Sequence, residues 1–469
     1  MITTDTTIAA IATPQTDKPG GISVIRISGT DAVSIAGKVF RIFAEKGKRR
    51  KSVSGMKSHT VAYGKIFDGK EHVDNGMVTV FLAPKSYTGE DVVEISCHGG
   101  VYVTKRVLSA CFTAGATPAG AGEFTKRALL NGKLSLTEAE SVIDIINAEN
   151  KQYLSFALQQ KEGALQQKID EIAQTILGIS AQLTAWIDYP EEVVAEGLDD
   201  FEISSDLGQL SEAHLKLKLL LESYQIGKVL RDGIVTAIVG KPNVGKSTIM
   251  NLLSGKKRSI VTPKAGTTRD IIEENVNIGG AVLVLSDCAG MRETDDEAEG
   301  IGVEIMLRRM KEAMLVLAVF DNSRELAKED YVLLELLHGK NAICVINKSD
   351  LETKLDLSFL CTQFNTVTEI SAKQPESLGK LTAVIEKYMQ LKRLDMSSGF
   401  LANERQRKCA VKAERALQRA IKEIEAKKKA YDILSIELES ALSALYELSG
   451  KRVSDEILET VFARFCVGK

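Results

Sequence analysis

The stretch Gly240-Lys241-Pro242-Asn243-Val244-Gly245-Lys246-Ser247 decides the fold of the middle part of this 469-residue chain. It matches the pattern G-x-x-x-x-G-K-[ST] and lies between a strand expected at 234–239 and an expected helix. In that context backbone N–H groups can surround phosphates, and the helix N-terminus adds positive potential. A glycine-rich turn is the alternative for the stretch on its own. The expected nucleotide contacts here are Asn243, Val244, Gly245, Lys246, Ser247 and Thr248, with Lys246 on the β- and γ-phosphates and Ser247 on magnesium.

A second motif, Asp287-Cys288-Ala289-Gly290, follows a strand expected at Ala281–Leu285. An aspartate at a strand end can hold magnesium through water, and the Gly290 backbone can meet a γ-phosphate. The loop Gly266–Asp270 lies before this motif, and Thr268 can supply a second hydroxyl to magnesium once GTP orders the loop. An ordinary polar loop is the alternative for that segment.

Two further motifs at strand ends indicate which base is bound. Asn347-Lys348-Ser349-Asp350 follows a strand expected at Ala342–Ile346, and its carboxylate can accept two N–H bonds from guanine, a donor pair that adenine lacks. A site built for that carboxylate rejects the wrong base, because its polar group would stay unpaired. Ser371-Ala372-Lys373, after a strand expected at Val367–Ile370, can give a backbone N–H to the guanine oxygen. Four motifs in this order predict that the chain binds GTP.

The residue after Gly290 limits the mechanism of hydrolysis. In Ras-like GTPases a glutamine at this position orients the attacking water, whereas this chain has Met291. Another group must therefore stabilise the transition state, and Asn243 can hold a monovalent cation where an arginine finger would lie. Acids follow nearby, for which solvated loop carboxylates are the alternative to a catalytic role. These acids are Glu293, Asp295, Asp296, Glu297 and Glu299.

Composition excludes several classes of protein. With 44% apolar and 26% charged residues the chain has the profile of a soluble globular protein. Its 60 basic and 63 acidic residues give a net charge of −3, so any nucleic-acid contact must use a local patch. The longest apolar run, Met314–Phe320, is too short to span a bilayer, and no secretory signal is expected at the start. The cysteines at 97, 111, 288, 344, 361, 409 and 466 form no C-x-x-C pair, which favours a reducing cytoplasm.

The order of expected elements predicts a multidomain chain. An α+β N-terminal domain is expected at 1–120, with strands at 21–27, 77–82 and 92–95 and a helix at 101–108. Strands that alternate with helices over 221–381 indicate an inserted α/β P-loop (Ras-like) G domain. An all-α helical domain is expected to surround it, in two parts at 121–220 and 382–469. In the first part, Thr137-Glu138-Ala139-Glu140 is expected as a capping box, and apolar residues from Ile169 to Trp186 form one helix face that ends before Pro190.

The chain resembles the MnmE (TrmE) family of tRNA-modification GTPases along essentially its whole length. Outside the nucleotide motifs the segments that carry the resemblance are Gly20–Gly29, Tyr87–Asp91, His98–Gly100, Gly122–Thr125, Asn131–Leu134, Asp188–Glu192 and Phe465–Lys469. The terminal Phe-Cys-Val-Gly-Lys is the most specific of them. Departures are small: Cys288 stands where the family usually has threonine, Met291 where it has leucine, and Val467 where it has isoleucine.

The resemblance implies a GTPase that works with an FAD-dependent partner, MnmG (GidA). Together such proteins install a carboxymethylaminomethyl-type group at the 5-position of the wobble uridine of certain tRNAs. A tetrahydrofolate derivative (5-formyl or 5,10-methylene form), bound by the N-terminal domain, supplies the one-carbon unit. The family pattern also implies a homodimer, no membrane association, and GTP hydrolysis that depends on Mg²⁺ and is stimulated by K⁺.

The family's site residues transfer by motif. The Asn243 side chain matches a potassium ligand, and the carbonyls that complete this site correspond to Thr262, Lys264 and Thr267. In the same loop, the GTP contacts correspond to Thr262, Thr267 and Thr268. Magnesium ligands correspond to Ser247 and Thr268, and Glu299 corresponds to a glutamate that helps to position the hydrolytic water. The folate contacts correspond to Arg26, Glu94, Lys133 and Lys469. A catalytic role for Cys466 in modification is also implied.

Taken without the family, several of these residues have ordinary alternatives. Arg26 can be a polar residue at a sheet edge, Lys133 a solvated surface residue and Cys466 a structural thiol. Glu94, inside an apolar run, needs either a partner or a ligand. The basic helix after Asn403 can be a solvated face or a tRNA-backbone patch. A different class of function, a regulatory switch in ribosome assembly, also stays open. The terminal motif and Arg26 distinguish it from a modification enzyme, because a pure switch would not need them.

Overall fold

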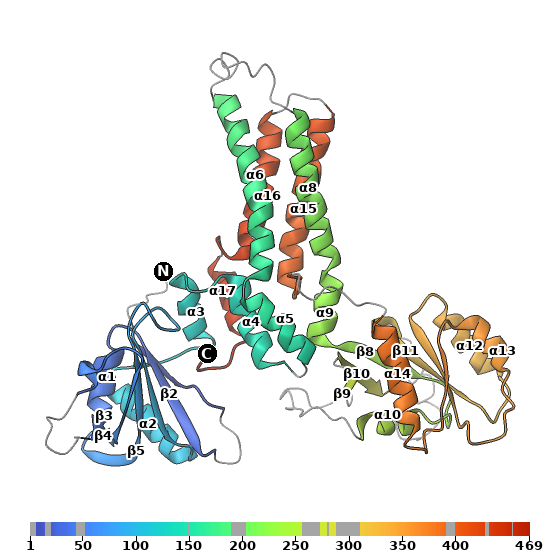
Figure 1. Ribbon diagram of the computed structural model, residues 1–469, viewed down its shortest axis with the longest axis horizontal. Helices are drawn as coiled ribbons and strands as arrows, with labels where there is room; N and C mark the ends of the chain where they lie inside the picture. Colours follow the sequence, from blue (N-terminus) through green and yellow to red (C-terminus); the bar gives the residue numbers. More distant parts are fainter. Residues whose placement is uncertain are drawn as a thin grey trace. The chain divides into compact units, whose positions relative to one another are not determined.

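The computed structural model describes residues 6–14, 20–43, 52–148, 151–188, 203–255, 273–278, 281–287, 310–390, 399–426, 431–452 and 454–469 (Figure 1). It divides into two compact units. The first unit contains residues 1–143, 169–207 and 415–469, and the second contains residues 144–168 and 208–414. Among the described residues, no helix combines the length and the apolar character that a membrane span requires.

The first unit contains a seven-stranded sheet in the order β3-β4-β5-β6-β2-β1-β7. Its neighbours pair antiparallel except for the parallel pair β1 and β7. The strands are β1 Ile8–Ile11, β2 Ile22–Ser28, β3 Phe40–Ile42, β4 Thr60–Asp68, β5 Glu71–Phe81, β6 Val92–His98 and β7 Thr117–Pro118. The α+β prediction is confirmed, although β1, β3, β4 and β7 did not stand out in the sequence.

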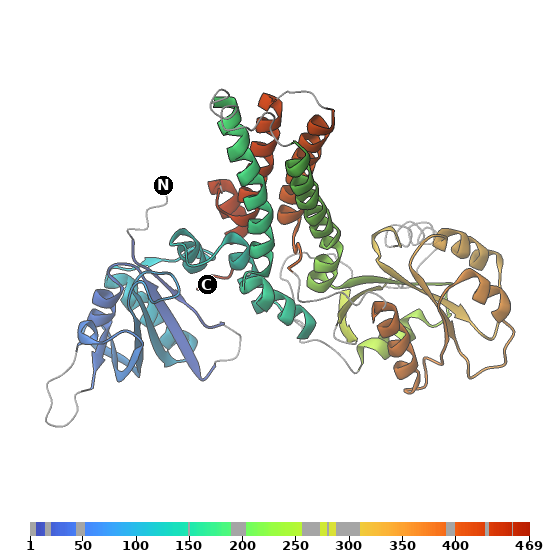
Figure 2. The same cartoon turned by 45° about the horizontal axis from the view of Figure 1, so that its top comes forward.

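Helices cover one face of this sheet. Alternate residues such as Ile25, Val80 and Ile95 point to this face and are fully buried, as period-two patterning requires. They pack against helix α1 Ala32–Val39 and helix α2 Val101–Thr113, which lie on the sheet in Figures 1 and 2. The expected helix at 101–108 is therefore confirmed and continues to Thr113.

Further helices of the first unit follow the sheet in sequence. They are α3 Glu123–Leu130, most of α4 Leu136–Ile146, most of α6 Ala164–Asp188, α16 Tyr431–Ser449 and α17 Asp455–Phe462, with a short 3-10 turn η1 Val53–Gly55 earlier in the chain. The expected apolar face of α6 is confirmed, since Ile169, Ile176 and Leu183 are fully buried. Residues after 168 of α6 run beside α16 in both views, and the ring of Trp186 lies 6.1 Å from that of Tyr431. Pro190 lies outside the described residues.

The capping box of α4 begins two residues before the predicted one. Ser135 Oγ accepts from the Glu138 N–H (3.3 Å), and Glu138 Oε2 accepts from the Ser135 N–H (2.6 Å). The prediction of Thr137 with Glu140 was wrong because Thr137 lies inside the helix and is buried. Two S/T-x-x-E patterns overlap here, and the structure uses the earlier one.

The second unit contains a six-stranded sheet in the order β13-β12-β11-β8-β10-β9. Its strands are β8 Ile234–Val239, β9 Glu273–Ile278, β10 Ala281–Asp287, β11 Leu315–Asp321, β12 Ala342–Asn347 and β13 Val367–Glu369. All neighbours pair parallel except β9, an antiparallel edge strand that the sequence analysis missed. The five predicted strands are confirmed, with boundaries that differ by up to two residues.

Both faces of this sheet are buried, which explains why its central strands are continuous apolar runs. Ile238, Val319 and Val345 pack on one face, whereas Val239 and Phe320 pack on the other. The helices of the α/β part are α10 Lys246–Ser254, α12 Lys328–Leu337, α13 Leu357–Gln363 and α14 Ser377–Gln390. The second unit also contains α5 Lys151–Lys161 and α9 Tyr224–Asp232. Most of α8 Ile203–Glu222 and half of α15 Glu404–Glu425 belong to it as well. The predicted P-loop architecture is thus the observed one.

Candidate nucleotide-binding site

The loop from Gly240 to Gly245 connects β8 to α10 in a conformation that needs glycine. The φ angles are +152° at Gly240, +64° at Asn243 and +102° at Gly245, which is also the N-cap of α10. A Cβ atom at Gly245 would lie 2.1 Å from Asn347 Nδ2, a distance that no real Cβ contact adopts. The glycine therefore lets the loop close against the next motif, with the N-terminus of α10 directed at the loop.

The buried Asn347 side chain connects three of the predicted segments. Its Nδ2 donates to the Val244 carbonyl oxygen (2.8 Å), and its Oδ1 accepts from the Ala372 N–H (2.9 Å). The Ser349 N–H also donates to the Ile370 carbonyl oxygen (3.1 Å). The motifs that the sequence assigned to phosphate and to guanine thus meet at the carboxyl ends of neighbouring parallel strands, where open α/β sheets bind ligands.

The loop that is predicted to bind phosphate has one lysine side chain fixed against it, and exposed polar side chains lie beside it. Lys246 Nζ donates to the carbonyl oxygens of Gly240 (2.9 Å) and Lys241 (2.7 Å), so the ammonium group is held against the loop. Ser247 and Thr248, in the first turn of α10, are exposed, as is the Asn243 side chain. Their oxygens are therefore accessible to a nucleotide and to the cations that accompany it.

The base end of the site presents an ionised carboxylate. Asp350 is exposed, and its pKa lies below the ordinary value, mainly because of the neighbouring Ser371 side chain, with Lys373 and Lys348 contributing positive charge. An ionised carboxylate only accepts hydrogen bonds, which matches the two donors of guanine. Lys348 adopts φ +65°, and its Nζ lies 2.6 Å from Asp321 Oδ2.

Some predicted residues of this site lie outside the described part of the chain. These are Thr262, Lys264, Thr267, Thr268, Gly290 and Glu299. Asp287 is described only as the last residue of β10, where it pairs with Ile238 of β8. The second magnesium ligand, the potassium loop and the glutamate for hydrolysis therefore stay predictions.

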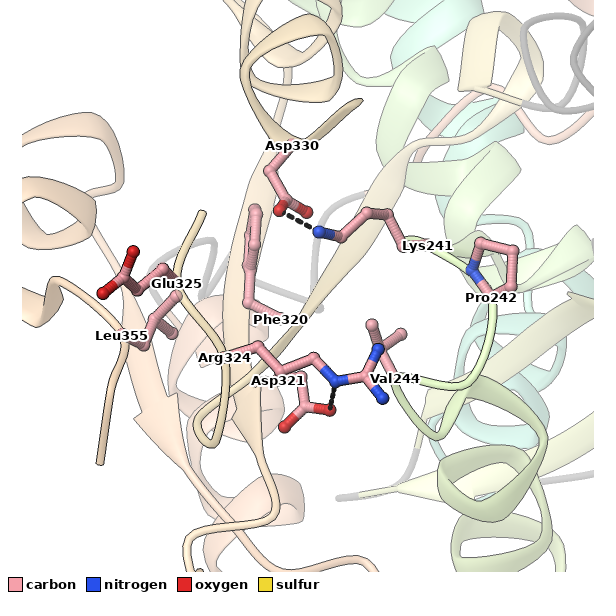
Figure 3. Close-up of a pocket in the computed structure, with 9 residues that line it drawn as sticks. All are labelled: Lys241, Pro242, Val244, Phe320, Asp321, Arg324, Glu325, Asp330 and Leu355. Atoms are coloured by element: carbon pink, nitrogen blue, oxygen red, sulfur yellow. Dashed lines mark ion pairs between the residues drawn. The ribbon is translucent and has the colours of Figure 1, made fainter. Parts of the chain in front are cut away.

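Sequence reasoning missed a group of acidic and basic residues next to the loop. A pocket there is lined by Lys241, Pro242, Val244, Phe320, Asp321, Arg324, Glu325, Asp330 and Leu355 (Figure 3). The buried Asp330 of α12 forms an ion pair with Lys241 of the loop. The only signal for Asp321 was its position at the end of an apolar strand, the same position that Asp287 and Asn347 occupy.

In the first unit the structure brings several predicted folate residues together. Arg26 and Glu94 are register partners on β2 and β6, and Arg26 Nε donates to Glu94 Oε1 (2.8 Å). The guanidinium carbon lies 5.8 Å from the centre of the Tyr87 ring and 5.6 Å from that of Phe124. Burial raises the pKa of Tyr87, whose hydroxyl lies 2.9 Å from Thr125 Oγ1. The need of Glu94 for a partner is therefore met by Arg26.

The chain's last residues lie against the N-terminal sheet and α3. Val467 pairs with Ala121, the Phe124 N–H donates to the Lys469 carbonyl oxygen (3.2 Å), and Arg26 Nη1 donates to the Gly468 carbonyl oxygen (3.4 Å). Gly468 has φ +103°, and a Cβ there would lie 2.2 Å from the Ile11 carbonyl oxygen. Cys466 is an exposed free thiol in this segment. The structure thus joins Arg26 and the terminal motif, which are 442 residues apart.

The other predicted residues of this unit differ in role. Lys133 Nζ donates to the Pro84 carbonyl oxygen (3.2 Å), so it reaches the same loop that presents Tyr87. Glu90, within the quoted segment Tyr87–Asp91, pairs with the buried Arg127 of α3 (3.1 Å) and accepts from Ser28 Oγ (2.8 Å). That contact anchors α3 to β2, because a buried arginine needs compensating acceptors.

Comparison with known proteins shows which family nearly the whole chain resembles. The model described as the MnmE helical domain matches residues 136–466, and the model of the GTP-binding protein TrmE N-terminus matches residues 7–133. A tRNA modification GTPase MnmE of Thermoanaerobacter pseudethanolicus is 40% identical over 472 residues, which are 99% of each chain. Its counterpart in Lactococcus lactis subsp. lactis is 42% identical over 477 residues, 99% of this chain and 98% of the relative. The G domain of the T. maritima FeoB iron transporter resembles 34% of this chain over 99% of its own, with 28% identity and a TM-score of 0.27.

Gly245→Ala should weaken the binding of guanine nucleotides by at least about tenfold, because the added methyl group would push Asn347 away from the loop. A fluorescence titration with a labelled GDP measures this. Gly379→Ala in α14 is the matched control, since nothing lies within 4 Å of a Cβ atom there. Equal affinities of Gly245→Ala and the unmodified chain would contradict the role given to this glycine.

Proposed function

The chain belongs to the MnmE family of tRNA modification GTPases, and from this premise we propose that it couples GTP hydrolysis to modification of the wobble uridine of certain tRNAs. In this proposal it acts with the FAD-dependent partner MnmG (GidA) in the cytoplasm. The group installed at the 5-position is of the carboxymethylaminomethyl type. The observation that carries the proposal is the meeting of the phosphate loop and the guanine motif at Asn347, within a chain that matches such GTPases over its full length.

GTP binding brings Mg²⁺ to the site, with Ser247 and Thr268 as the proposed ligands. A magnesium ion held there would neutralise phosphate charge that develops during hydrolysis. The exposed Ser247 hydroxyl next to the loop supports this assignment. Asp287 would hold the ion through water, in keeping with its place at the end of β10 beside β8.

The proposed substitute for the missing glutamine is a potassium ion. Its ligands would be the Asn243 side chain and the carbonyls of Thr262, Lys264 and Thr267, and Glu299 would position the attacking water. Asn243 supports the proposal because it is exposed on the loop and adopts the left-handed φ of +64°, which asparagine tolerates better than most residues.

A reduced folate is the proposed one-carbon donor, bound near the Arg26–Glu94 pair. The Glu94 carboxylate can accept N–H bonds from a pterin ring, and the rings of Tyr87 and Phe124 can pack against it. Lys133 and Lys469 would supply positive charge for the carboxylates of the folate. The nearby segment Phe465–Lys469 brings the Cys466 thiol to the same part of the fold. The folate, when bound, would supply the one-carbon unit.

We further propose a homodimer through the N-terminal domain. The sheet face opposite α1 and α2 keeps Val61 53%, Tyr63 56% and Met77 48% exposed, and these residues are neighbours across β4 and β5. A cluster of exposed apolar residues on a sheet marks an interaction surface. We also propose the domain boundaries expected from the sequence, which are 1–120 for the N-terminal domain, 121–220 and 382–469 for the helical domain, and 221–381 for the G domain.

For tRNA we propose contacts by the basic face of α15. This face consists of Lys408, Lys412, Arg415, Arg419 and Lys422, which are exposed at steps of three and four residues. Arg419 is engaged by Glu437 at 2.7 Å, so Lys408, Arg415 and Lys422 carry the proposal. Phosphate contacts of this kind give affinity without sequence preference.

A regulatory switch in ribosome assembly is the second candidate function. A pure switch would have no use for the arrangement that joins Arg26, Glu94 and the terminal segment. The modification function therefore accounts for more of the observed contacts.

Hydrolysis of GTP should be faster in potassium than in sodium chloride, and Asn243→Ala should remove most of this difference. The reason is that the amide oxygen is the one proposed side-chain ligand of the cation. Rates at saturating GTP in the two salts measure it. Asn251→Ala, an exposed asparagine further along α10, is the control and should keep the stimulation. Equal rates of GTP hydrolysis by the unmodified chain in both salts would refute the proposed role of potassium.

Nucleoside analysis of tRNA tests the proposed function in cells that lack this protein. The modified wobble uridine should be absent, and the unmodified gene should restore it. Arg26→Gln should fail to restore it although the purified variant hydrolyses GTP normally, because it disturbs only the folate region. Arg106→Gln, which removes a surface pairing with Asp68 and Glu71, is the matched control and should restore the modification. Normal modification without the protein would favour the regulatory switch.

A further inference from the structure

An acid at the end of β11 contacts the base-recognition motif and has no role in the function described so far. Asp321 is buried, with 5% of its side chain exposed. Its Oδ2 lies 2.6 Å from Lys348 Nζ, and its Oδ1 accepts from the Ser323 N–H (3.0 Å) and the Ser323 hydroxyl (2.7 Å). Arg324 Nε lies 3.8 Å from Oδ2 (Figure 3). The carboxylate is therefore fixed from both sides.

The backbone next to Asp321 is fixed to the same motif. Asp321 pairs with Asn347 in the β11–β12 register, and the Asn322 N–H donates to the Asn347 carbonyl oxygen (2.9 Å). The Asn322 side chain also donates to Leu351 and Thr353 beyond the motif. The end of β11 thus contacts Asn347 and Lys348 of the motif and the residues that follow it, and Lys348 itself has the left-handed φ of +65°.

We propose that Asp321 is a positioning residue for guanine nucleotides, which acts by holding the Lys348 side chain across the base-binding surface. The aliphatic stem of a lysine held at its ammonium end presents a flat apolar surface on which a base can pack. Without the carboxylate the stem regains rotamer freedom, which nucleotide binding must then remove. The proposal rests on the GTPase assignment, since it concerns the same site.

The ionisation of Asp321 is consistent with this role. Partial burial raises its pKa, but hydrogen bonds from Lys348 and Ser323 outweigh burial, and the pKa lies below the ordinary value. The carboxylate is therefore charged at neutral pH. A charged acceptor makes a stronger hydrogen bond to an ammonium group than a neutral amide does.

The sign of the effect separates positioning from simple electrostatics. GTP is strongly anionic, so removal of a nearby negative charge should by Coulomb's law strengthen binding. Loss of a positioning contact should weaken it. Glu325 offers a matched control, because it lines the same pocket four residues away, is exposed, and makes no ion pair among the described residues.

The test is a titration of the full chain with N-methylanthraniloyl-GDP. Asp321→Asn should bind about tenfold more weakly, the loss expected from a weakened charged hydrogen bond, and Glu325→Gln should bind as well as the unmodified chain or better. In GTP hydrolysis Asp321→Asn should raise KM and leave kcat unchanged. Unchanged or tighter binding of Asp321→Asn, or equal weakening in both variants, would overturn the proposal.

A second variant keeps the test decisive if Asp321→Asn loses stability. In a Lys348→Met background the Asp321→Asn change should have no further effect on affinity, because its target is gone. The same loss in both backgrounds would overturn the proposal, since Asp321 would then act elsewhere. Failure of the unmodified chain to bind the labelled GDP would instead refute the GTPase assignment, so the two failures are distinguishable.

Discussion

The side-chain amide of Asn347 is the contact on which the nucleotide site depends. It donates to the phosphate loop at Val244 and accepts from the loop that follows β13 at Ala372, and both partners are within 2.9 Å. Because the amide is buried, each of its two hydrogen bonds would be costly to leave unmade. The absence of a side chain at Gly245 gives it room to reach the loop. Asn347 therefore connects the loop that is predicted to bind phosphate to the segment that is predicted to contact the base.

The parallel sheet makes this contact possible. Its strands are buried on both faces, so polar residues are concentrated at their carboxyl ends, where Asp287, Asp321 and Asn347 terminate β10, β11 and β12. The first unit differs, since Arg26 and Glu94, which are predicted to bind folate, are register partners on neighbouring strands, and Arg26 and Ala121 contact the terminal segment of the chain. In both units a sheet holds residues of the predicted site, and segments distant in the sequence contact them.

The nucleotide site could be predicted from local sequence patterns, because each motif is short and follows a strand that is apolar enough to recognise. The pairing of Arg26 with Glu94, 68 residues later, could not be predicted from a local pattern, because the register of two strands depends on the whole sheet. The family resemblance named these residues, but only the structure showed that they touch. The α4 cap was assigned two residues late because Ser135 and Thr137 both fit the pattern. Strand β9 was missed because Glu273–Ile278 is a polar edge strand, and the role of Asp321 needed the strand order β8-β11-β12.

The central claim is that one buried amide assembles a site for guanine and no other base. The most direct measurement compares the affinities of the full chain for GDP and ADP by calorimetry in potassium and magnesium. A carboxylate at Asp350 that accepts from both guanine donors predicts a preference for GDP of at least about 100-fold, because adenine would leave it unpaired. Comparable affinities for the two nucleotides, or tighter binding of ADP, would contradict the account.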